Sequence, residues 1–365
     1  MQNMELNNHE KERYARQLIL PEFGTEGQLK LKNAKILLVG VGGLGSPQAI
    51  YLSASGVGTL GIIDPDSVAL NNLHRQVIHF TKDVGRSKVV SAQEKIEQIN
   101  PHVKVLTYPA KLTAQNALEI FKNYDLIIDG TDNFSARYLI NDACVMLAKP
   151  FIFGGIFRFE GQVSVFGLKD GPCYRCLFGE PPASEAIPSC AQAGVLGVLP
   201  GIVGLIQANE AIKIICGIGE PLRERLLIFD ALTTTFREVR IKKDPACPMC
   251  GDHKTIVNLK EYQENCLGGK NMEISVPELK EIMNDFSKKY VLIDVREPLE
   301  WDKGHIAGAV SKPLSTFEEN YQDIPKDGKV FIHCQAGSRS SKAVEFLRSK
   351  GYTNCWNVGG GMNAW

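Results

Sequence analysis

The sequence predicts two α/β domains, the first with a mainly parallel sheet and helices on both faces. The chain has 365 residues, more than one hydrophobic core usually organises. Over residues 1–250, short apolar stretches alternate with helix-compatible stretches, which is typical of parallel strands joined by helices. A polar segment at 251–271 then precedes a second, smaller α/β pattern at 272–365, so we place the linker there.

The predicted elements follow one another in a regular order. A polar, helical opening at 10–31 leads to a strand at 34–39, a glycine-rich loop and a helix at 47–55. The next elements of the first domain are a strand at 59–63, a helix at 87–99 and strands at 103–108 and 125–129. In the second domain we expect strands at 291–295 and 330–333 and a helix at 340–350.

The composition carries no net charge, with 41 Lys and Arg against 41 Asp and Glu, so no overall field attracts nucleic acid or an anionic membrane. The polar residues 1–13 lack an apolar signal core, and we find no stretch close to the roughly 20 apolar residues that span a bilayer. We therefore expect a cytoplasmic protein with no nucleic-acid and no membrane partner. In a reducing compartment, its ten cysteines should serve metal binding, catalysis or burial instead of disulfides.

The loop after the first strand is glycine-rich, with Gly40, Gly42, Gly43 and Gly45. This Rossmann-like arrangement lets backbone N–H groups and a helix N-terminus approach a phosphate. Asp64 ends the next strand, where an acidic side chain can accept hydrogen bonds from ribose hydroxyls. Because these features fit NAD as well as ATP, they leave a nicotinamide oxidoreductase open.

Two cations and a carboxylate favour ATP. Arg75 lies in the segment N-N-L-H-R-Q at 71–76, and Lys88 begins the next helix. Displacement at an α-phosphate builds negative charge that such donors stabilise, whereas hydride transfer needs no such clamp. Asp132 follows a strand end and is placed to hold Mg²⁺ beside the phosphates. Each residue alone is more often an ordinary surface or turn residue, but the three together beside a glycine loop indicate a nucleotide site.

At these residues the first domain resembles the MoeB/ThiF family, adenylyltransferases related to the catalytic halves of ubiquitin-activating enzymes. The resemblance covers about residues 14–251 through Y-A-R-Q at 14–17, the glycine loop, N-L-H-R-Q at 72–76 and T-D-N at 131–133. It implies a homodimer in which Arg16 reaches the nucleotide of the neighbouring protomer. The residues that it implies as contacts of MgATP are Gly43, Asp64, Asn71, Asn72, Arg75, Lys88, Asp132 and Asn133.

Two Cys-x-x-Cys pairs, Cys173 with Cys176 and Cys247 with Cys250, supply four thiolates in a spacing that suits tetrahedral zinc. Four protein ligands leave no open position for substrate, so the zinc would be structural. A disulfide is disfavoured by the compartment, and a redox pair would usually occur singly at a helix start. We therefore predict a zinc site.

Cys190 lies in a segment at 180–194 that contains three prolines and few large apolar residues. In the resembling family, a cysteine at this place can attack the activated carrier or resolve a later sulfur intermediate. An incidental loop thiol is the alternative, and position alone favours a functional one. The other cysteines, expected to be buried or incidental, are Cys144, Cys216, Cys266 and Cys355.

The second domain resembles a rhodanese domain through D-V-R-E at 294–297, E-W-x-x-G-H-I at 300–306 and C-Q-A-G-S-R-S at 334–340. A strand delivers Cys334 into a short loop whose N–H groups, together with the following helix N-terminus and Arg339, should lower the pKa of the thiol and stabilise a persulfide. The alternative is a phosphate-binding loop of the Cys-x5-Arg phosphatase type. Here Arg339 follows Cys334 by only five positions, and this shorter loop forms a smaller ring that matches sulfur better than phosphate.

Together these features predict adenylation, with ATP and Mg²⁺, of the C-terminal glycine of a small ubiquitin-like sulfur carrier that resembles MoaD or ThiS. The Cys334 persulfide, loaded by a cysteine desulfurase or thiosulfate, would then deliver sulfur. The alternatives are a nicotinamide oxidoreductase fused to a sulfurtransferase and a non-catalytic scaffold that binds a modifier. The sequence leaves the carrier and its pathway open, whether molybdopterin, thiamine, cysteine or tRNA thiolation.

Overall fold

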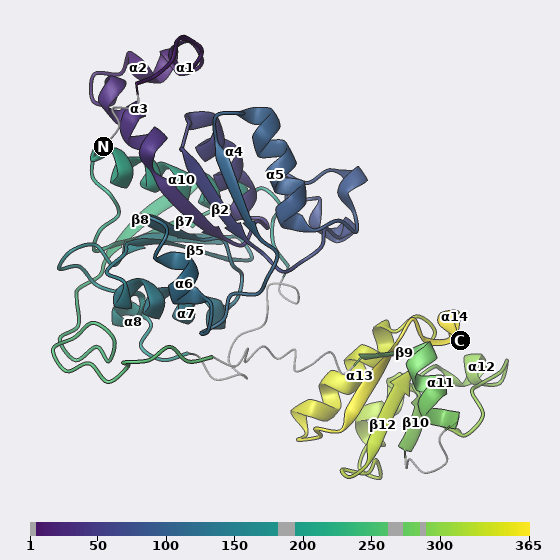
Figure 1. Cartoon of the computed structure of the whole chain (residues 1–365). Helices are drawn as coiled ribbons and strands as arrows, with labels where there is room; N and C mark the ends of the chain where they lie inside the picture. The colour runs from purple at the N-terminus through teal and green to yellow at the C-terminus, as the bar shows by residue number, and fades with distance from the viewer. Residues whose placement is uncertain (1–4, 182–193, 262–272, 285–289) are drawn as a thin grey trace. The chain divides into compact units, whose positions relative to one another are not determined.

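The computed structural model of the chain describes residues 5–181, 194–261, 273–284 and 290–365. The chain divides into two compact units, Met1–Leu267 and Gly268–Trp365. Each is an α/β unit with its own sheet, which confirms the predicted fold class (Figure 1). The predicted strands appear within one residue of their expected bounds.

The first unit contains an eight-stranded sheet in the order β3-β2-β1-β4-β5-β6-β7-β8. The first five strands in this order are parallel, and the last three pair antiparallel. Their bounds are β1 Lys35–Val39, β2 Thr59–Ile63, β3 Lys104–Tyr108, β4 Leu126–Asp129, β5 Phe151–Phe157, β6 Glu160–Phe166, β7 Arg225–Asp230 and β8 Thr235–Arg240. The parallel strands bring the loops after β1, β2, β3 and β4 to one edge.

Helices connect these strands and cover both faces of the sheet. Their bounds are α1 Asn8–Arg13, α2 Ala15–Leu18, α3 Gly24–Asn33, α4 Gly45–Ser55, η1 Leu70–Asn72, η2 Thr81–Asp83, α5 Lys88–Ile99, α6 Ala117–Phe121, α7 Phe134–Met146, α8 Tyr174–Leu177 and α10 Leu199–Cys216. The helical opening expected at 10–31 is divided into three short helices. Pro21 cannot donate a backbone hydrogen bond and Gly24 has a φ of +53°, so the chain turns between α2 and α3.

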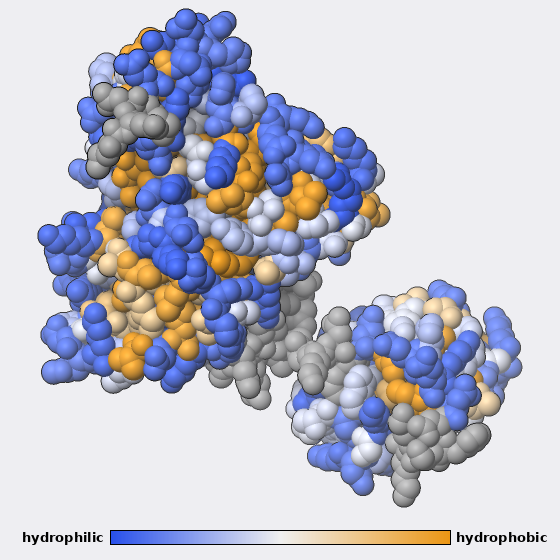
Figure 2. All heavy atoms as spheres, viewed as in Figure 1, coloured by the Kyte–Doolittle hydropathy of each residue, from blue (hydrophilic) through white to orange (hydrophobic). Residues whose placement is uncertain are grey.

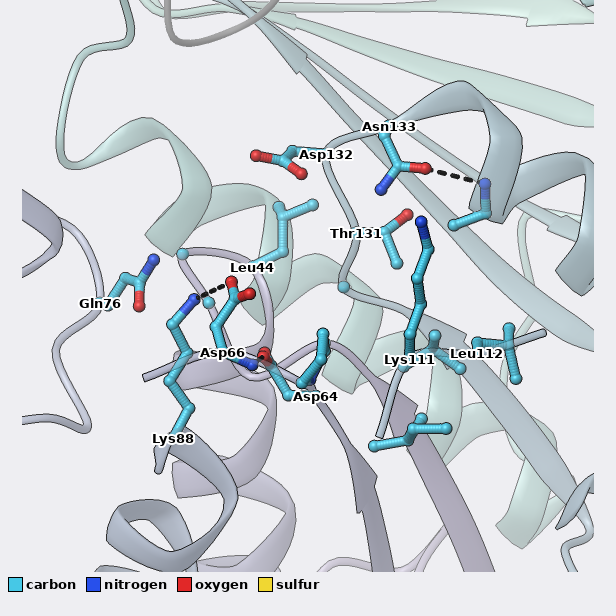
Figure 3. Close-up of a pocket in the computed structure, with 18 of the residues that line it drawn as sticks. Leu44, Asp64, Asp66, Gln76, Lys88, Lys111, Leu112, Thr131, Asp132 and Asn133 are labelled. Carbon is cyan, nitrogen blue, oxygen red and sulfur yellow. Dashed lines mark hydrogen bonds and ion pairs between the residues drawn. The ribbon is translucent and has the colours of Figure 1, made fainter. Parts of the chain in front are cut away.

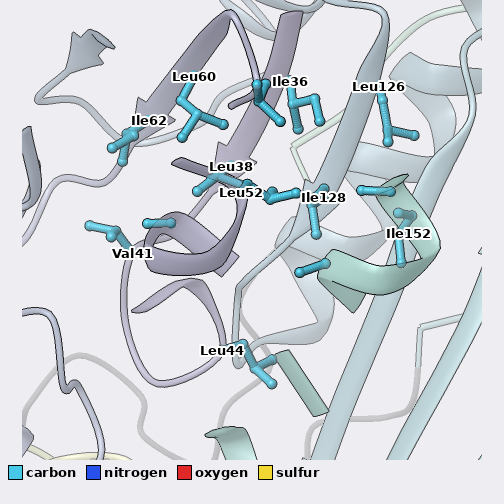
Figure 4. Packing of buried hydrophobic residues seen from close by; sticks show 14 of the residues in the cluster. Ile36, Leu38, Val41, Leu44, Leu52, Leu60, Ile62, Leu126, Ile128 and Ile152 are labelled. Carbon is cyan, nitrogen blue, oxygen red and sulfur yellow. The ribbon is translucent and has the colours of Figure 1, made fainter. Parts of the chain in front are cut away.

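Strand alternation divides the first unit's core into two layers, and Figure 4 shows the layer that contains Ile36 and Leu38. Ile36 and Leu38 pack on one face with α4 and α10, whereas Leu37 and Val39 pack on the other with α6 and α7. The sequence led us to expect no stretch close to a membrane span, but among the described residues α10 alone has the length and apolar composition to cross a membrane. Half of this helix is buried within the unit. Its apolar composition is explained by packing against α4, β5 and β6.

The end of the first unit reaches beyond Cys250. Residues 251–261 lie within the expected linker, yet Ile256 packs beside the paired cysteines and Leu259 against the second core layer. Glu261 accepts a hydrogen bond of 2.6 Å from the backbone N–H of Ala114. These apolar contacts hold the segment on the first unit.

The second unit has a five-stranded, fully parallel sheet in the order β11-β10-β12-β13-β9. The strands are β9 Glu273–Ser275, β10 Tyr290–Asp294, β11 Ala309–Ser311, β12 Lys329–His333 and β13 Cys355–Gly359. The helices are α11 Val276–Asn284, α12 Pro298–Trp301, η3 Leu314–Glu319, α13 Ser338–Ser349 and α14 Gly361–Ala364. The central β12 is buried on both sides, with Val330 and Ile332 in one cluster and Phe331 in the other, and ends directly before Cys334.

Candidate functional site

A pocket of about 790 Å³ opens at the carboxyl edge of the parallel strands in the first unit (Figure 3). This volume is in the range of small-molecule sites. The pocket lies between the loops that follow β1, β2, β3 and β4. The predicted nucleotide residues that line it are Gly40, Gly42, Gly43, Asp64, Asn71, Arg75, Lys88, Asp132 and Asn133.

The path of the glycine loop depends on close contacts with neighbouring backbone segments, which only glycine allows. Gly40 has a φ of +90°, and a Cβ there would lie 2.9 Å from the carbonyl oxygen of Gly130 after β4. A Cβ on Gly45 would lie only 2.2 Å from the Gly40 carbonyl oxygen. Gly45 does not line the pocket directly, but it lets α4 begin against the loop. Any larger residue at these positions would push the loop away from the strand edge.

Asp64 fixes the loop from the neighbouring strand. One carboxylate oxygen accepts from the Val41 N–H at 2.9 Å and the other from the Asp66 N–H at 2.9 Å. Burial raises the pKa of Asp64, an effect that the nearby Lys88 charge and these N–H donors partly oppose. Each oxygen keeps a second lone pair, so ribose hydroxyls could still donate to it.

His79 supports the same loop from behind. Its ring nitrogens lie 3.1 Å from the Val41 carbonyl oxygen and 3.0 Å from the Ser91 hydroxyl. Burial lowers the pKa of His79 to about 4, so the ring is neutral at physiological pH.

The two predicted cations line the pocket from different loops. Lys88 is nearly buried, and its Nζ lies 2.7 Å from a carboxylate oxygen of Asp66. Arg75 uses Nη1 to contact the carbonyl oxygen of Asn71 at 3.0 Å and Nε2 of His74 at 2.8 Å. Two neighbouring groups, neither of them an anion, therefore hold the Arg75 guanidinium in place.

The loop after β4 brings a carboxylate and an amide to the pocket. Asp132 is exposed and lines the pocket. Among the described residues, its side chain makes no hydrogen bond or ion pair. The Asn133 side chain caps α7 by accepting from the Ala136 N–H at 2.8 Å. Asn72 does not line the pocket, because its side chain accepts from the Ala69 N–H and donates to Asn71.

Sequence reasoning missed two polar residues of this pocket. Gln76 is 5% exposed, and its Oε1 has no hydrogen-bond partner among the described residues. Lys111 follows β3 and extends into the pocket beside Thr131 and Asn133 in Figure 3. Gln76 ends the N-N-L-H-R-Q motif, from which only Asn71, Asn72 and Arg75 were predicted as site residues. The segment around Lys111 carries no motif that could have identified it.

Two predicted residues lie elsewhere. Arg16, on α2, is exposed and does not line the pocket of its own chain. Cys190 lies outside the described residues, so its prediction stays open.

The four paired cysteines meet in one cluster, with their sulfur atoms within 4.8 Å of one another. The separations are 3.6 Å for Cys173–Cys247, 4.0 Å for Cys173–Cys176 and 3.3 Å for Cys176–Cys250. Tetrahedral zinc with bonds of about 2.3 Å places thiolates roughly 3.8 Å apart, whereas a disulfide requires about 2.05 Å. The cluster fits a zinc ion, which would join α8 to the end of the first unit.

In the second unit, Cys334 is buried at the start of a tight loop. Its sulfur accepts a hydrogen bond from the Gly337 N–H at 3.1 Å, and the Ser340 hydroxyl lies 3.3 Å away. Burial by itself raises the pKa of Cys334, but the Ser340 hydroxyl and the N–H groups of Ser340, Ala336 and Gly337 outweigh it, so the net pKa is lowered. The loop therefore favours an anionic sulfur.

Ion pairs hold this loop from both sides. Arg339 makes a bidentate pair with Glu300, with N–O distances of 2.6 and 2.7 Å. The charge expected to serve Cys334 is thus shared with a carboxylate, and the Arg339 hydrogen bonds lower the pKa of Glu300 to about 2. Arg296 binds Asp294 at 2.7 Å and reaches Gln335, the residue after Cys334, at 3.4 Å.

Comparison with known proteins identifies the class. Residues 14–249 match the ThiF family, and residues 275–365 match the rhodanese-like domain. The chain therefore belongs to the ThiF family and carries a C-terminal rhodanese-like domain, as the motifs predicted.

Relatives match this chain over most of its length. The probable adenylyltransferase/sulfurtransferase MoeZ of Mycobacterium tuberculosis is 44% identical over 375 residues, covering 99% of this chain and 94% of that protein. The adenylyltransferase and sulfurtransferase MOCS3 of Arabidopsis thaliana is 40% identical over 386 residues, covering 97% and 82%. The sulfur carrier protein adenylyltransferase of Thermus thermophilus is 50% identical over 268 residues, covering 72% and 99%.

A solved structure agrees with the fold. The crystal structure of E. coli MccB has a TM-score of 0.61 and 22% identity, and the match covers 69% of this chain and 74% of that one.

We expect one zinc ion per chain. Cys247→Ser removes one of four thiolates and should lower the zinc content of the purified protein to well below one equivalent, because a three-thiolate site binds more weakly. Emission spectrometry of the metal content measures this. Cys216→Ser, at a buried cysteine outside the cluster, should retain the metal; equal loss in both variants, or a zinc-free parent with four titratable thiols, would contradict the assignment.

The cradle should set the reactivity of Cys334. Ser340→Ala removes a donor to the sulfur and should move the pH profile of Cys334 alkylation upward by roughly half to one unit, because the thiolate loses a hydrogen bond. The rate of iodoacetamide labelling, followed by mass spectrometry of the Cys334 peptide, gives the profile. Ser341→Ala on the same helix is the matched control, and an unchanged or lowered midpoint in the Ser340 variant would refute the role of this hydroxyl.

Proposed function

We propose that the chain adenylates the C-terminal glycine of a small ubiquitin-like sulfur carrier and then transfers sulfur to it from Cys334. One observation carries the first step: a single pocket gathers the glycine loop, Arg75, Lys88 and Asp132 from separate segments. The anion-stabilising cradle of Cys334 supports the second step.

In this proposal, ATP lies along the carboxyl edge of the sheet. The glycine-loop N–H groups face the phosphates, Asp64 receives the ribose, and Arg75 and Lys88 flank the triphosphate. The apolar side chains of Leu112 and Leu139, which line the pocket beyond Asp64, give the base a surface to pack on. Asp132 is the residue that would hold Mg²⁺, which neutralises phosphate charge when bound.

Adenylation needs no covalent contribution from the chain. A carboxylate oxygen of the carrier attacks the α-phosphorus of ATP, and the bond from that phosphorus to the bridging oxygen breaks. Pyrophosphate leaves with the electron pair, and the carrier is left as an acyl-adenylate. Arg75 and Lys88 contribute by donating to oxygens whose charge rises during this displacement.

An exposed apolar patch offers a place for the body of the carrier. Hydrophobic patches lie among hydrophilic residues on the face of the first unit seen in Figure 2. One apolar patch adjoins the pocket, because Ile156 and Val195 line the pocket and the residues that follow them, Phe157 and Leu196, are exposed. Its residues are Phe157 (41% exposed), Phe159 (42%), Leu196 (40%), Val198 (58%), Leu232 (70%) and Phe236 (54%). A carrier docked here could extend its C-terminal tail to the α-phosphate.

Sulfur transfer follows in balanced steps. The Cys334 thiolate takes a sulfane sulfur from a desulfurase persulfide or thiosulfate, releasing a thiolate or sulfite. The terminal persulfide sulfur attacks the acyl carbon, and AMP leaves, giving an acyl disulfide on Cys334. A second thiol, Cys190 or an external one, attacks Sγ of Cys334, releases the carrier thiocarboxylate and forms a disulfide. An external dithiol reduces this disulfide.

We propose that the chain is cytoplasmic, because a reducing environment keeps the zinc thiolates and Cys334 available.

We also propose that the chain forms a homodimer. Arg16 is exposed beside Ile19 and Leu20, which are 69% and 51% exposed, so this surface has both an apolar contact area and a cation to offer a second protomer.

The oxidoreductase alternative is disfavoured, because the relatives named above are adenylyltransferases and sulfurtransferases. Tight NAD binding with no response to ATP would restore it. A non-catalytic scaffold would show no exchange activity with any small carrier ending in Gly-Gly.

The two steps should separate by mutation. Cys334→Ala should leave carrier-dependent ATP–pyrophosphate exchange intact and abolish thiocarboxylate formation, because the adenylation pocket does not contain the thiol. Asp132→Ala should abolish both. Radiolabelled exchange and mass spectrometry of the carrier measure the two steps, and loss of exchange in a folded Cys334 variant would contradict the division.

The Arg16 proposal predicts complementation between inactive chains. Arg16→Ala and Asp132→Ala should each be inactive alone, whereas an equal mixture after subunit exchange should recover about a quarter of the wild-type exchange rate, since half of randomly paired dimers are hybrids with one complete site. Exchange assays on the mixture test this. No recovery, with dimers demonstrated, would show that Arg16 does not act across the interface.

A further inference from the structure

Lys88 is held by a carboxylate of the same pocket. Its Nζ lies 2.7 Å from Oδ2 of Asp66, and both side chains line the pocket wall (Figure 3). The Lys88 side chain is only 7% exposed, whereas that of Asp66 is 62% exposed. A nearly buried ammonium without a partner is costly, so the Asp66 carboxylate stabilises the charge of Lys88.

Hydrogen bonds fix the backbone of Asp66, whereas, among the described residues, its exposed carboxylate is held only by the ion pair with Lys88. The Asp66 N–H donates to Asp64 at 2.9 Å, and its carbonyl oxygen accepts from the Lys88 N–H at 3.0 Å. A bridge between Ser67 and Ser87 continues this contact. Rotation of the exposed Asp66 side chain can therefore break the ion pair without moving the start of α5.

Arg75 provides the contrast. Among the described residues, its hydrogen-bond partners are the Asn71 carbonyl oxygen and the His74 ring, and neither of them is an anion. Lys88 instead shares its charge with an anion. A phosphate that approaches Lys88 must compete with the Asp66 carboxylate, and like-charge repulsion opposes their occupying neighbouring positions.

We propose that Asp66 is a latch for Lys88, a positioning residue that occupies the ammonium in the empty pocket and yields it to polyphosphate. This inference rests on the proposed function for its physiological ligand, the triphosphate of ATP. On release of pyrophosphate, the Asp66 carboxylate recaptures Lys88 and favours departure of the product. The latch therefore weakens polyphosphate affinity and speeds product release.

Calorimetric titration of the full chain with pyrophosphate, in buffer without divalent cations, tests the latch. Asp66→Asn removes the competing charge at nearly constant size and should tighten pyrophosphate binding roughly two- to fivefold, the effect of an ion pair whose carboxylate is largely exposed to solvent. Glu261→Gln is the matched control, because it removes one pocket carboxylate that lies by Ala114 and not by Lys88; it should change the affinity less. In a Lys88→Met background, Asp66→Asn should give a clearly smaller gain, because only the direct repulsion between Asp66 and pyrophosphate is then removed.

Several results would overturn the latch. They are weaker or unchanged binding in Asp66→Asn, an equal gain in Glu261→Gln, or a gain from Asp66→Asn that is undiminished in the Lys88→Met background. An effect of Asp66→Asn confined to magnesium-containing buffer would instead make Asp66 a metal ligand. A parent chain that binds no pyrophosphate would also refute it. Because these titrations need neither carrier nor turnover, the latch can stand if carrier-dependent exchange fails, and exchange can stand if the latch fails.

Discussion

The close approach of two backbone segments at the edge of the first sheet determines the rest of the nucleotide pocket. A Cβ on Gly130 would lie 2.6 Å from the Gly40 carbonyl oxygen, so the chain after β1 and the chain after β4 can meet only as glycines. This contact brings Asp132 to face the glycine loop. Asp64 and His79 then hold the loop through Val41 from two further segments. Backbone contacts therefore set the spacing between the glycine loop and the loop after β4, and the polar side chains project from these two fixed segments.

In both units, a loop at the end of a parallel strand stabilises negative charge with backbone N–H groups. In the first, a glycine loop opens toward α4, and in the second, the loop after β12 opens toward α13 through Gly337 at a φ of +93°. Exposed N–H groups at such turns attract negative charge, whether phosphate oxygens or a thiolate. Each loop is also braced from behind. A Cβ on Gly361 would lie 2.1 Å from the Cys334 carbonyl oxygen, so α14 closes tightly on the cradle.

The cysteines show how environment separates residues of one type. Four gather within bonding reach of a common ion, and Cys334 has donors around its sulfur. Cys144, Cys216 and Cys355 are buried, as expected, and burial raises the pKa of each, to about 11 for the last two. Burial without donors keeps these thiols protonated and unreactive, whereas the Cys334 loop reverses the effect of the same burial.

The sequence by itself determined the fold class, the strand positions, the four cysteines that cluster and the place of Cys334 after a strand, because these depend on local periodicity and on motifs with fixed spacing. Parallel pairing then required the segments after β1, β2 and β4 to share an edge. Only the tertiary structure decided how individual side chains are engaged there. Whether Lys88 meets Asp66, whether Asn72 faces the pocket, and whether Arg339 pairs with Glu300 depend on rotamers and burial between segments distant in the chain. The extension of the first unit to Glu261 and the place of Lys111 in the pocket were likewise decided by packing, which leaves no periodic trace in the sequence.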